Sequence, residues 1–163
     1  MRLLTGLPEI CLLLRPDKLM CYLLQLIIGE LMKKRMVLLA DSHPALLEGI
    51  RGLLGAVFDS VVMVSDEGSL VEALTRLDPD LVVVDQSLRV AHGSNVITLL
   101  KKYDSELRII ALSSYPEPVF MKQCMSSGAS GYVLKRSAAK DLVKAVKEVL
   151  RGGAFVTSDV GTS

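Results

Sequence analysis

Four polar residues of this sequence, Asp41, Asp85, Ser113 and Lys135, each follow directly on a short apolar run. Each run is typical of a buried strand, and the strands of an open parallel sheet end along one edge, where ligands bind. Taken singly, each residue is readily explained as a cap, turn or surface residue. Together they predict that two carboxylates, a hydroxyl and an ammonium group converge on one crevice. Such a set suits a divalent cation and a phosphoryl group.

The bulk composition limits the class of protein. The chain has 163 residues, the size of one domain with a short appendage, and its 50% hydrophobic residues are enough for a full core. A net charge of +1 argues against nucleic-acid binding as the main function, and the absence of Trp argues against a base-stacking platform. Cys11, Cys21 and Cys124 form neither a CxxC pair nor a metal-ligand cluster, so we expect reduced thiols in a cytoplasmic protein.

Residues 1–35 differ in composition from the rest, with six basic and three acidic residues. Their apolar stretch from Leu19 to Met32 is shorter than the ~20 residues of a membrane-spanning helix. It also lacks the cleavage site of a signal peptide. Three interpretations stay open: an amphipathic helix that docks on the domain or on a membrane surface, an unstructured leader, or an artefact of start-site choice. The last arises because Met32 or Met36 would each begin a complete domain.

From Met36 onward, predicted strands and helices alternate in five strand–helix units. Helix starts are indicated by Pro44, by Ser69 with Glu72 as a capping box, and by Ser137. The strand segments are continuously apolar, which is typical of strands covered on both faces. With right-handed crossovers, this pattern predicts a doubly wound, three-layer α/β fold around a five-stranded parallel sheet, that is, a flavodoxin-like (βα)5 domain.

Four segments together resemble the receiver domain of bacterial response regulators, the CheY-like domain: residues 41–44, 81–85, 111–113 and 128–135. The His43-Pro44 pair and the segment from Gly131 to Lys135 are most similar to the LuxR/NarL-type branch. The resemblance covers about residues 35–155. We therefore divide the chain into an N-terminal extension (1–35), a receiver domain (36–153) and a C-terminal linker stub (154–163).

The resemblance implies a role for each residue of the crevice. Asp85 would accept a phosphoryl group from a histidine kinase, and Lys135 would pair with an oxygen of that group. Asp41 and Asp85, with the backbone carbonyl of Ser87, would hold Mg²⁺. Ser113 would turn its hydroxyl toward the acyl phosphate. These residue types suit the chemistry, because Mg²⁺ and a lysine offset the repulsion between an attacking carboxylate and an anionic phosphoryl group.

Ser113 and Tyr132 would form the switch, since the family has an aromatic residue at the position of Tyr132 that swings inward on activation. Two residues depart from the family pattern. Ser42 stands where the family has a second metal-binding acid, and could contribute only through a water molecule. Arg89 brings a cation into the loop after Asp85, where it would deter Mg²⁺ or partly replace it. Because Mg²⁺ commonly uses only one or two carboxylates, we expect weakened binding and not its loss.

Three functions remain open at this point. The first is a single-domain receiver in a two-component phosphorelay, whose only enzymatic chemistry is its own phosphotransfer and dephosphorylation. The second is a degenerate receiver that binds protein partners without phosphate. The third is an enzyme or small-ligand binder of the same fold, which is disfavoured because no glycine-rich phosphate loop follows the first strand.

The first function predicts the kinds of partner. We expect a histidine kinase or phosphotransfer protein, a downstream protein whose binding depends on the switch, and a second copy of the chain if it forms a homodimer. Only residues 154–163 follow the predicted domain, too few for a helix-turn-helix. We therefore expect no direct DNA binding by this chain.

Overall fold

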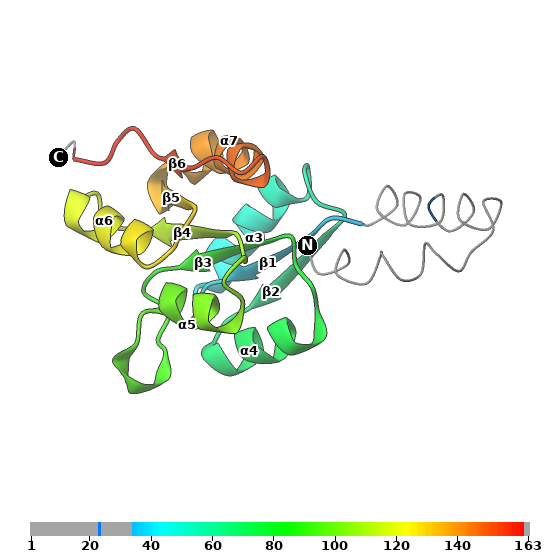
Figure 1. Ribbon diagram of the computed structural model, residues 1–163. Coiled ribbons are helices and arrows are strands. Elements are labelled where there is room, and N and C mark those ends of the chain that lie inside the picture. Colours follow the sequence, from blue (N-terminus) through cyan, green and yellow to red (C-terminus); the bar gives the residue numbers. More distant parts are fainter. Residues whose placement is uncertain (1–22, 24–33, 162–163) are drawn as a thin grey trace. The chain divides into compact units, whose positions relative to one another are not determined.

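The computed structural model of the protein describes residue 23 and residues 34–161 (Figure 1). The chain divides into two units, Met1–Lys34 and Arg35–Ser163. Only Leu23 and Lys34 of the first unit are described, so the interpretations of the N-terminal extension concern residues outside the described part and stay predictions. Among the helices that are described, none combines the length and the apolar character needed to cross a membrane.

One parallel sheet forms the centre of the second unit (Figure 1). Its strands follow the spatial order β2-β1-β3-β4-β5-β6, and every neighbouring pair is parallel. The strands are β1 Met36–Ala40, β2 Ser60–Val64, β3 Leu81–Asp85, β4 Ile109–Ser113, β5 Gly131–Leu134 and β6 Phe155–Val156. The order reverses at β1, so that β1 and β3 lie side by side and their carboxyl ends form the crevice expected of a doubly wound sheet.

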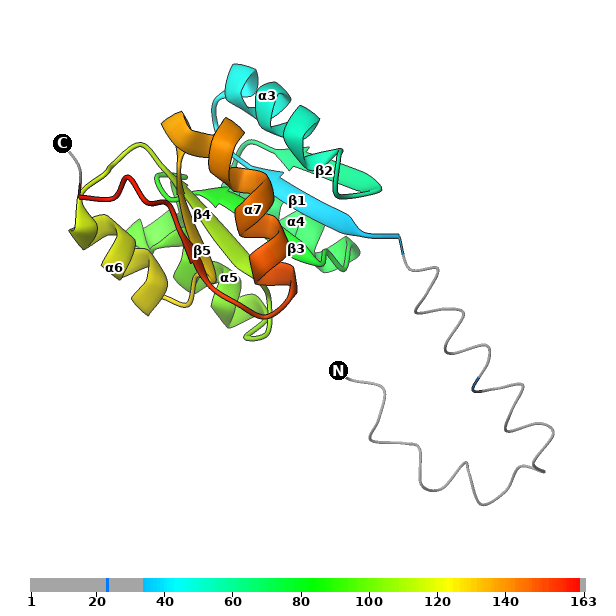
Figure 2. The same cartoon turned by 90° about the horizontal axis from the view of Figure 1, so that it is seen from above.

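Helices cover both faces of the sheet (Figure 2). Two helices, α3 (Pro44–Leu54) and α7 (Ala138–Leu150), pack on one face. Three helices, α4 (Glu67–Arg76), α5 (Val96–Tyr103) and α6 (Pro118–Ser126), pack on the other. Short 3-10 turns precede α5 (Ala91–Gly93) and α7 (Lys135–Ser137). The predicted three-layer α/β architecture is confirmed.

Strand side chains alternate between two separate cores. In β1, Val37 and Leu39 belong to the core under α3 and α7, whereas Leu38 and Ala40 belong to the core under α4, α5 and α6. All four are fully buried. A strand that is covered on both faces needs apolar residues at every position, which is why the sequence shows continuous apolar runs here.

The sheet has one strand more than the five predicted. Strand β6 pairs with β5 in the register Gly131↔Phe155 and Tyr132↔Val156, within the segment 154–163 that was predicted to be a linker stub. The backbone of this segment continues toward α6, where the Gly161 amide donates to the Pro116 carbonyl over 2.8 Å (Figure 2). Two residues are too short for a recognisable apolar run, and their extended form depends on the free edge of β5, so the sequence pattern alone did not reveal this strand.

The predicted start of α4 was wrong. Its N-cap is Asp66, whose Oδ1 accepts a hydrogen bond from the Ser69 amide over 2.9 Å, so that Ser69 lies inside the first turn. Aspartate and serine are about equally good N-cap residues, so residue type alone did not identify the cap. Ser137 precedes α7 as predicted, but its hydroxyl donates to Asp159 Oδ2 over 3.0 Å and does not cap the helix.

Candidate functional site

The carboxyl ends of β1, β3 and β5 bring two aspartates and a lysine together. Asp41 follows β1, Asp85 ends β3, and the β1–β3 register Ala40↔Val84 places the two aspartates level with each other. Both are buried. The ammonium group of Lys135, directly after β5, lies 2.7 Å from Asp41 Oδ2 and 2.8 Å from Asp85 Oδ2. The structure therefore unites three of the four residues that the sequence predicted to converge.

Charge balance explains why two buried carboxylates are tolerated here. Burial by itself raises the pKa of Asp41, but hydrogen bonds from Lys135 and His43 lower it further than burial raises it, so the net pKa is below its usual value. Burial likewise lowers the pKa of Lys135, whereas its bonds to Asp41 and Asp85 raise it, and the net pKa is raised. Lys135 is therefore an ammonium group and Asp41 a carboxylate at neutral pH.

His43 is a member of the site that sequence reasoning did not include. Its backbone amide donates to Asp41 Oδ1 over 2.9 Å, and its ring Nδ1 lies 2.8 Å from the same oxygen. The ring is 67% exposed. An aspartate that accepts a hydrogen bond from the amide two residues on is a common local motif, and the Asp-x-His spacing was the available signal. Asp41 is thus held from two sides, by His43 at Oδ1 and by Lys135 at Oδ2.

The loop after β3 fixes the carboxylate of Asp85. The Ser87 amide donates to Asp85 Oδ1 over 3.0 Å, and the Ser87 hydroxyl donates to Oδ2 over 2.8 Å. Ser87 was predicted to serve through its backbone carbonyl, and the structure adds a contact of its side chain. Asp85 Oδ2 consequently accepts from both Ser87 and Lys135, which fixes the orientation of the carboxylate.

Ser113 and Tyr132 lie beside this site and have other partners. Ser113 Oγ accepts hydrogen bonds from Gln86 Nε2 over 2.6 Å and from the Tyr115 amide over 3.0 Å. Tyr132 is fully buried, and its hydroxyl donates to the Tyr115 carbonyl over 2.6 Å. Burial raises the pKa of Tyr132, which keeps the hydroxyl a donor. Tyr132 is thus already in the inward position that the resemblance associates with activation.

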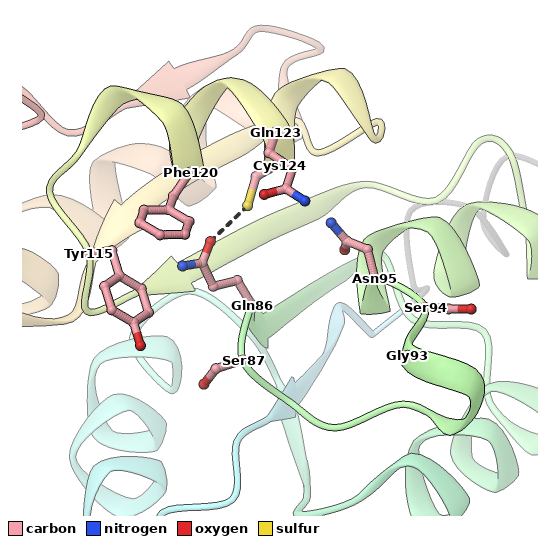
Figure 3. A pocket seen from close by; sticks show the side chains of 9 residues that line it. All are labelled: Gln86, Ser87, Gly93, Ser94, Asn95, Tyr115, Phe120, Gln123 and Cys124. Atoms are coloured by element: carbon pink, nitrogen blue, oxygen red, sulfur yellow. Dashed lines mark hydrogen bonds between the residues drawn. The ribbon is translucent and has the colours of Figure 1, made fainter.

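A pocket of about 270 Å³ lies between the loop after β3, the start of α5 and helix α6 (Figure 3). Gln86 projects into it from the loop, while Phe120 and Cys124 face it from α6. The Cys124 thiol donates to Gln86 Oε1 over 3.0 Å. Gln86, like His43, is a residue of the site that the sequence did not predict. Its position directly after Asp85 was the available signal.

The acidic residues present the atoms that a hard cation needs. Ligand atoms of Asp41, His43 and Asp85 lie within 4.8 Å of one another. In the described part of the chain, Asp41 Oδ2 is buried and pairs with the Lys135 ammonium group at 2.7 Å. A buried carboxylate oxygen with spare lone-pair capacity and a second carboxylate close by are oxygen donors of the kind that fits Mg²⁺.

The two departures from the family pattern lie at the surface. Ser42 is exposed, between Asp41 and His43. Arg89 is also exposed and, in the part of the chain that the structure describes, takes no part in the ion pairs of Asp41 and Asp85. The cation that the two aspartates share is Lys135.

Comparisons with known sequences agree on one family. Residues 37–147 match the model of the response regulator receiver domain. The chain is similar to the Fimbriae Z protein of Salmonella typhimurium, with 32% identity over 130 residues that cover 78% of this chain and 62% of that protein. It is similar to the transcription regulator BvgA of Bordetella pertussis, with 32% identity over 124 residues, 75% of this chain and 59% of BvgA. The chain thus spans about three fifths of the length of these curated relatives.

Solved structures of response regulators are similar to this chain as well. The RcsB response regulator of Salmonella typhimurium superposes with a TM-score of 0.70 at 30% identity, over 79% of this chain and 66% of that one. The isolated receiver domain of RcsB from Salmonella enterica serovar Typhimurium, solved with the phosphomimetic BeF3−, superposes with a TM-score of 0.68 at 28% identity. That match covers 78% of this chain and 96% of the receiver domain.

Proposed function

Because this chain belongs to the response regulator receiver domain family, we propose that it accepts a phosphoryl group on Asp85 in a two-component phosphorelay. The observation that carries this proposal is the arrangement of Asp85 itself. It is a buried carboxylate at a strand end, and a lysine ammonium group lies 2.8 Å from its Oδ2. The donor would be a phosphorylated histidine of a kinase or phosphotransfer protein.

The transfer would proceed as a nucleophilic displacement at phosphorus. A carboxylate oxygen of Asp85 forms the new O–P bond while the N–P bond of the phosphohistidine breaks, and the electron pair leaves with the imidazole. The Lys135 ammonium group would then exchange its contact with the carboxylates for one with an oxygen of the phosphoryl group. Its positive charge would stabilise the transition state there. Ser87 keeps the Asp85 carboxylate in its orientation through two hydrogen bonds.

Asp41, Asp85 and the backbone carbonyl of Ser87 would hold Mg²⁺ in this proposal. When bound, the ion neutralises charge on the phosphoryl group and orients it toward the attacking carboxylate. Ser42 lacks the carboxylate of a further ligand and could act only through water, so the affinity should be modest. His43 engages Asp41 Oδ1, so the cation would bind at Oδ2 in competition with the Lys135 ammonium group.

The output would be a changed surface around α6, β5 and α7. Ser113 at the end of β4, Tyr115 in the following loop and Tyr132 in β5 are joined by hydrogen bonds, and this loop leads directly into α6. A shift of the Ser113 hydroxyl toward a phosphoryl group on Asp85 would therefore alter the loop and the start of α6. A downstream protein, or a second copy of the chain, would bind the altered surface.

The test is intact mass spectrometry of the full chain after incubation with acetyl phosphate and Mg²⁺. We expect the wild-type protein to gain one phosphoryl group and Asp85→Asn to gain none. Asp104→Asn is a matched control, because Asp104 is an exposed aspartate outside the site. It should be phosphorylated like the wild type.

Two outcomes would contradict the proposal. Equal phosphorylation of Asp85→Asn would place the acceptor elsewhere. No phosphorylation of the wild type at saturating Mg²⁺ would favour the degenerate receiver, which binds its partners without phosphate.

A further inference from the structure

The hydroxyl of Ser113 is restrained by the side chain of Gln86, the residue that follows the acceptor aspartate. We propose that Gln86 is a positioning residue that holds the Ser113 hydroxyl on the α6 side of the sheet and so opposes its movement toward Asp85. This inference rests on the proposed function in one respect, namely that Asp85 is where the phosphoryl group arrives. The restraint itself is a property of the structure.

Sheet register explains why these two side chains meet. Asp85 is paired with Leu112, and the Gln86 amide donates to the Leu112 carbonyl over 2.9 Å, so Gln86 is level with Ser113. Side chains alternate along a strand. Leu112 belongs to the core under α3 and α7, and Ala111 to the core under α4, α5 and α6. Ser113 therefore shares the face of Ala111, which is the side of α6 and the pocket.

Cys124 determines which end of the Gln86 amide faces Ser113. Its thiol donates to Gln86 Oε1 over 3.0 Å across the pocket (Figure 3). Burial raises the pKa of this thiol to about 11, so it remains a protonated donor at neutral pH. A primary amide has its acceptor and its donors at opposite ends. With Oε1 engaged by Cys124, the NH2 group is directed at Ser113, as the 2.6 Å contact requires.

The Gln86 bond must break when Ser113 turns. Two donors, Gln86 Nε2 and the Tyr115 amide, use the acceptor capacity of Ser113 Oγ. Its own proton has the Tyr132 hydroxyl and, at 3.5 Å, the Tyr115 carbonyl as neighbours. That distance is too long for a good O–H···O hydrogen bond. A phosphoryl oxygen would be a better acceptor, but to reach it the hydroxyl must leave Gln86. The Gln86 bond therefore stabilises only the unswitched arrangement.

The movement of Ser113 is the remaining step of the switch in this protein. Tyr132 is already buried and bonded to the Tyr115 carbonyl, so it needs no swing. The loss of one neutral hydrogen bond should shift the equilibrium between the two positions of the Ser113 hydroxyl by roughly two- to tenfold. We expect a change of that size when the restraint from Gln86 is removed.

The experiment compares wild type with Gln86→Met, which keeps the length and volume of the side chain and removes its donor. The first readout is hydrogen exchange of the Tyr115 amide, which donates to Ser113 Oγ. We expect exchange about two- to tenfold faster in Gln86→Met, because Ser113 leaves this amide more often. The second readout is the rate of phosphorylation by acetyl phosphate with Mg²⁺, which should rise by a similar factor.

Three controls separate a restraint from a general packing effect. Gln123→Met changes another glutamine that lines the pocket but does not bond to Ser113, and both readouts should match wild type. In a Ser113→Ala background, Gln86→Met should leave the phosphorylation rate unchanged. Cys124→Ala frees the Gln86 amide and should partly reproduce Gln86→Met, whereas Cys124→Ser keeps a donor and should behave like wild type.

The outcomes separate the two proposals. Unchanged Tyr115 exchange in Gln86→Met and in Cys124→Ala would overturn the inference, as would slower phosphorylation of Gln86→Met, since Gln86 would then present the hydroxyl and not restrain it. Faster Tyr115 exchange in a protein whose wild type takes up no phosphoryl group would uphold the restraint and reject Asp85 as an acceptor. If Gln86→Met fails to fold, Tyr115 exchange in Cys124→Ala, compared with that in Cys124→Ser, tests the restraint in its place.

Discussion

Lys135 Nζ lies 2.8 Å from Asp85 Oδ2, although the two residues are 50 positions apart in the chain. The same ammonium group is 2.7 Å from Asp41 Oδ2. One lysine thus compensates two buried carboxylates that lie at the carboxyl ends of two different strands, β1 and β3. A cation or a phosphoryl group that enters the crevice must compete with these two ion pairs. The free energy of unfolding of the domain should therefore change when Lys135 is replaced.

Replacement of Lys135 by methionine should destabilise the domain by roughly 3 kcal/mol in the absence of divalent ions, because two buried carboxylates lose their counter-charge. Millimolar Mg²⁺ should restore a large part of this loss, since the ion can then neutralise Asp41 and Asp85. Urea unfolding with and without Mg²⁺ measures both effects. Lys144→Met, which changes an exposed lysine of α7, should have little effect with or without the ion. Equal behaviour of the two variants would show that the Lys135 ion pairs do not stabilise the fold.

The stability contributed by Asp41 should disappear in acid. Burial raises and hydrogen bonds lower the pKa of Asp41, with a net value below 3.8, the ordinary value that applies to the unfolded chain. A lowered pKa in the folded state means that the carboxylate contributes its full stability above pH 3.8 and loses it as the pH falls through the lower, folded value. The free energy of unfolding of wild type minus that of Asp41→Asn, measured in urea, should be constant between about pH 5 and 7 and shrink below about pH 4. A difference that grows in acid would mean that the pKa is raised instead.

Thr157 should stabilise the β5 edge through its hydroxyl, which accepts a hydrogen bond from the Leu134 amide over 3.3 Å. The side chain is almost completely buried, so Thr157→Val would leave a buried amide without a partner while preserving the shape of the residue. We expect a loss of about 1–3 kcal/mol in thermal or urea unfolding. Ser158→Ala, at the exposed neighbouring position, should stay within about 0.5 kcal/mol of wild type. A neutral Thr157→Val would mean that another acceptor serves Leu134.

Cys124 should be unreactive toward alkylation in the folded protein. Burial raises its pKa from 9.0 to about 11, and the thiolate is the reactive form. At pH 8 the thiolate fraction should therefore be roughly a hundredfold below that of an ordinary thiol. Iodoacetamide labelling followed by mass spectrometry, in a variant with Cys11→Ser and Cys21→Ser, can be compared between native and urea-unfolded protein. Native labelling at the unfolded rate would contradict both the burial and the donor role of this thiol.

Much of the fold could be predicted because buried parallel strands impose a simple requirement on sequence. Strands β1, β3, β4 and β5 need apolar residues on both faces, and the runs that meet this requirement stop where the polar residues of the crevice begin. Strand β6 has only two residues, which pair with the edge of β5, so it leaves no apolar run of recognisable length in the sequence. The start of α4 was ambiguous for a different reason, since Asp66 and Ser69 are both good caps and only the backbone geometry chooses between them.

For the site, the sequence by itself determined which chemical groups stand at the strand ends: the carboxylates of Asp41 and Asp85, the hydroxyl of Ser113 and the ammonium group of Lys135. Only the tertiary structure decided how they are partnered. Lys135 joins both carboxylates, while Ser113 turns to Gln86 on the other side of the sheet. The physical reason is that local apolar patterns show where strands lie along the chain and which residues end them. Hydrogen-bond partners depend instead on register and on the packing of α6 at distances of a few ångströms, which residue spacing along the chain does not encode.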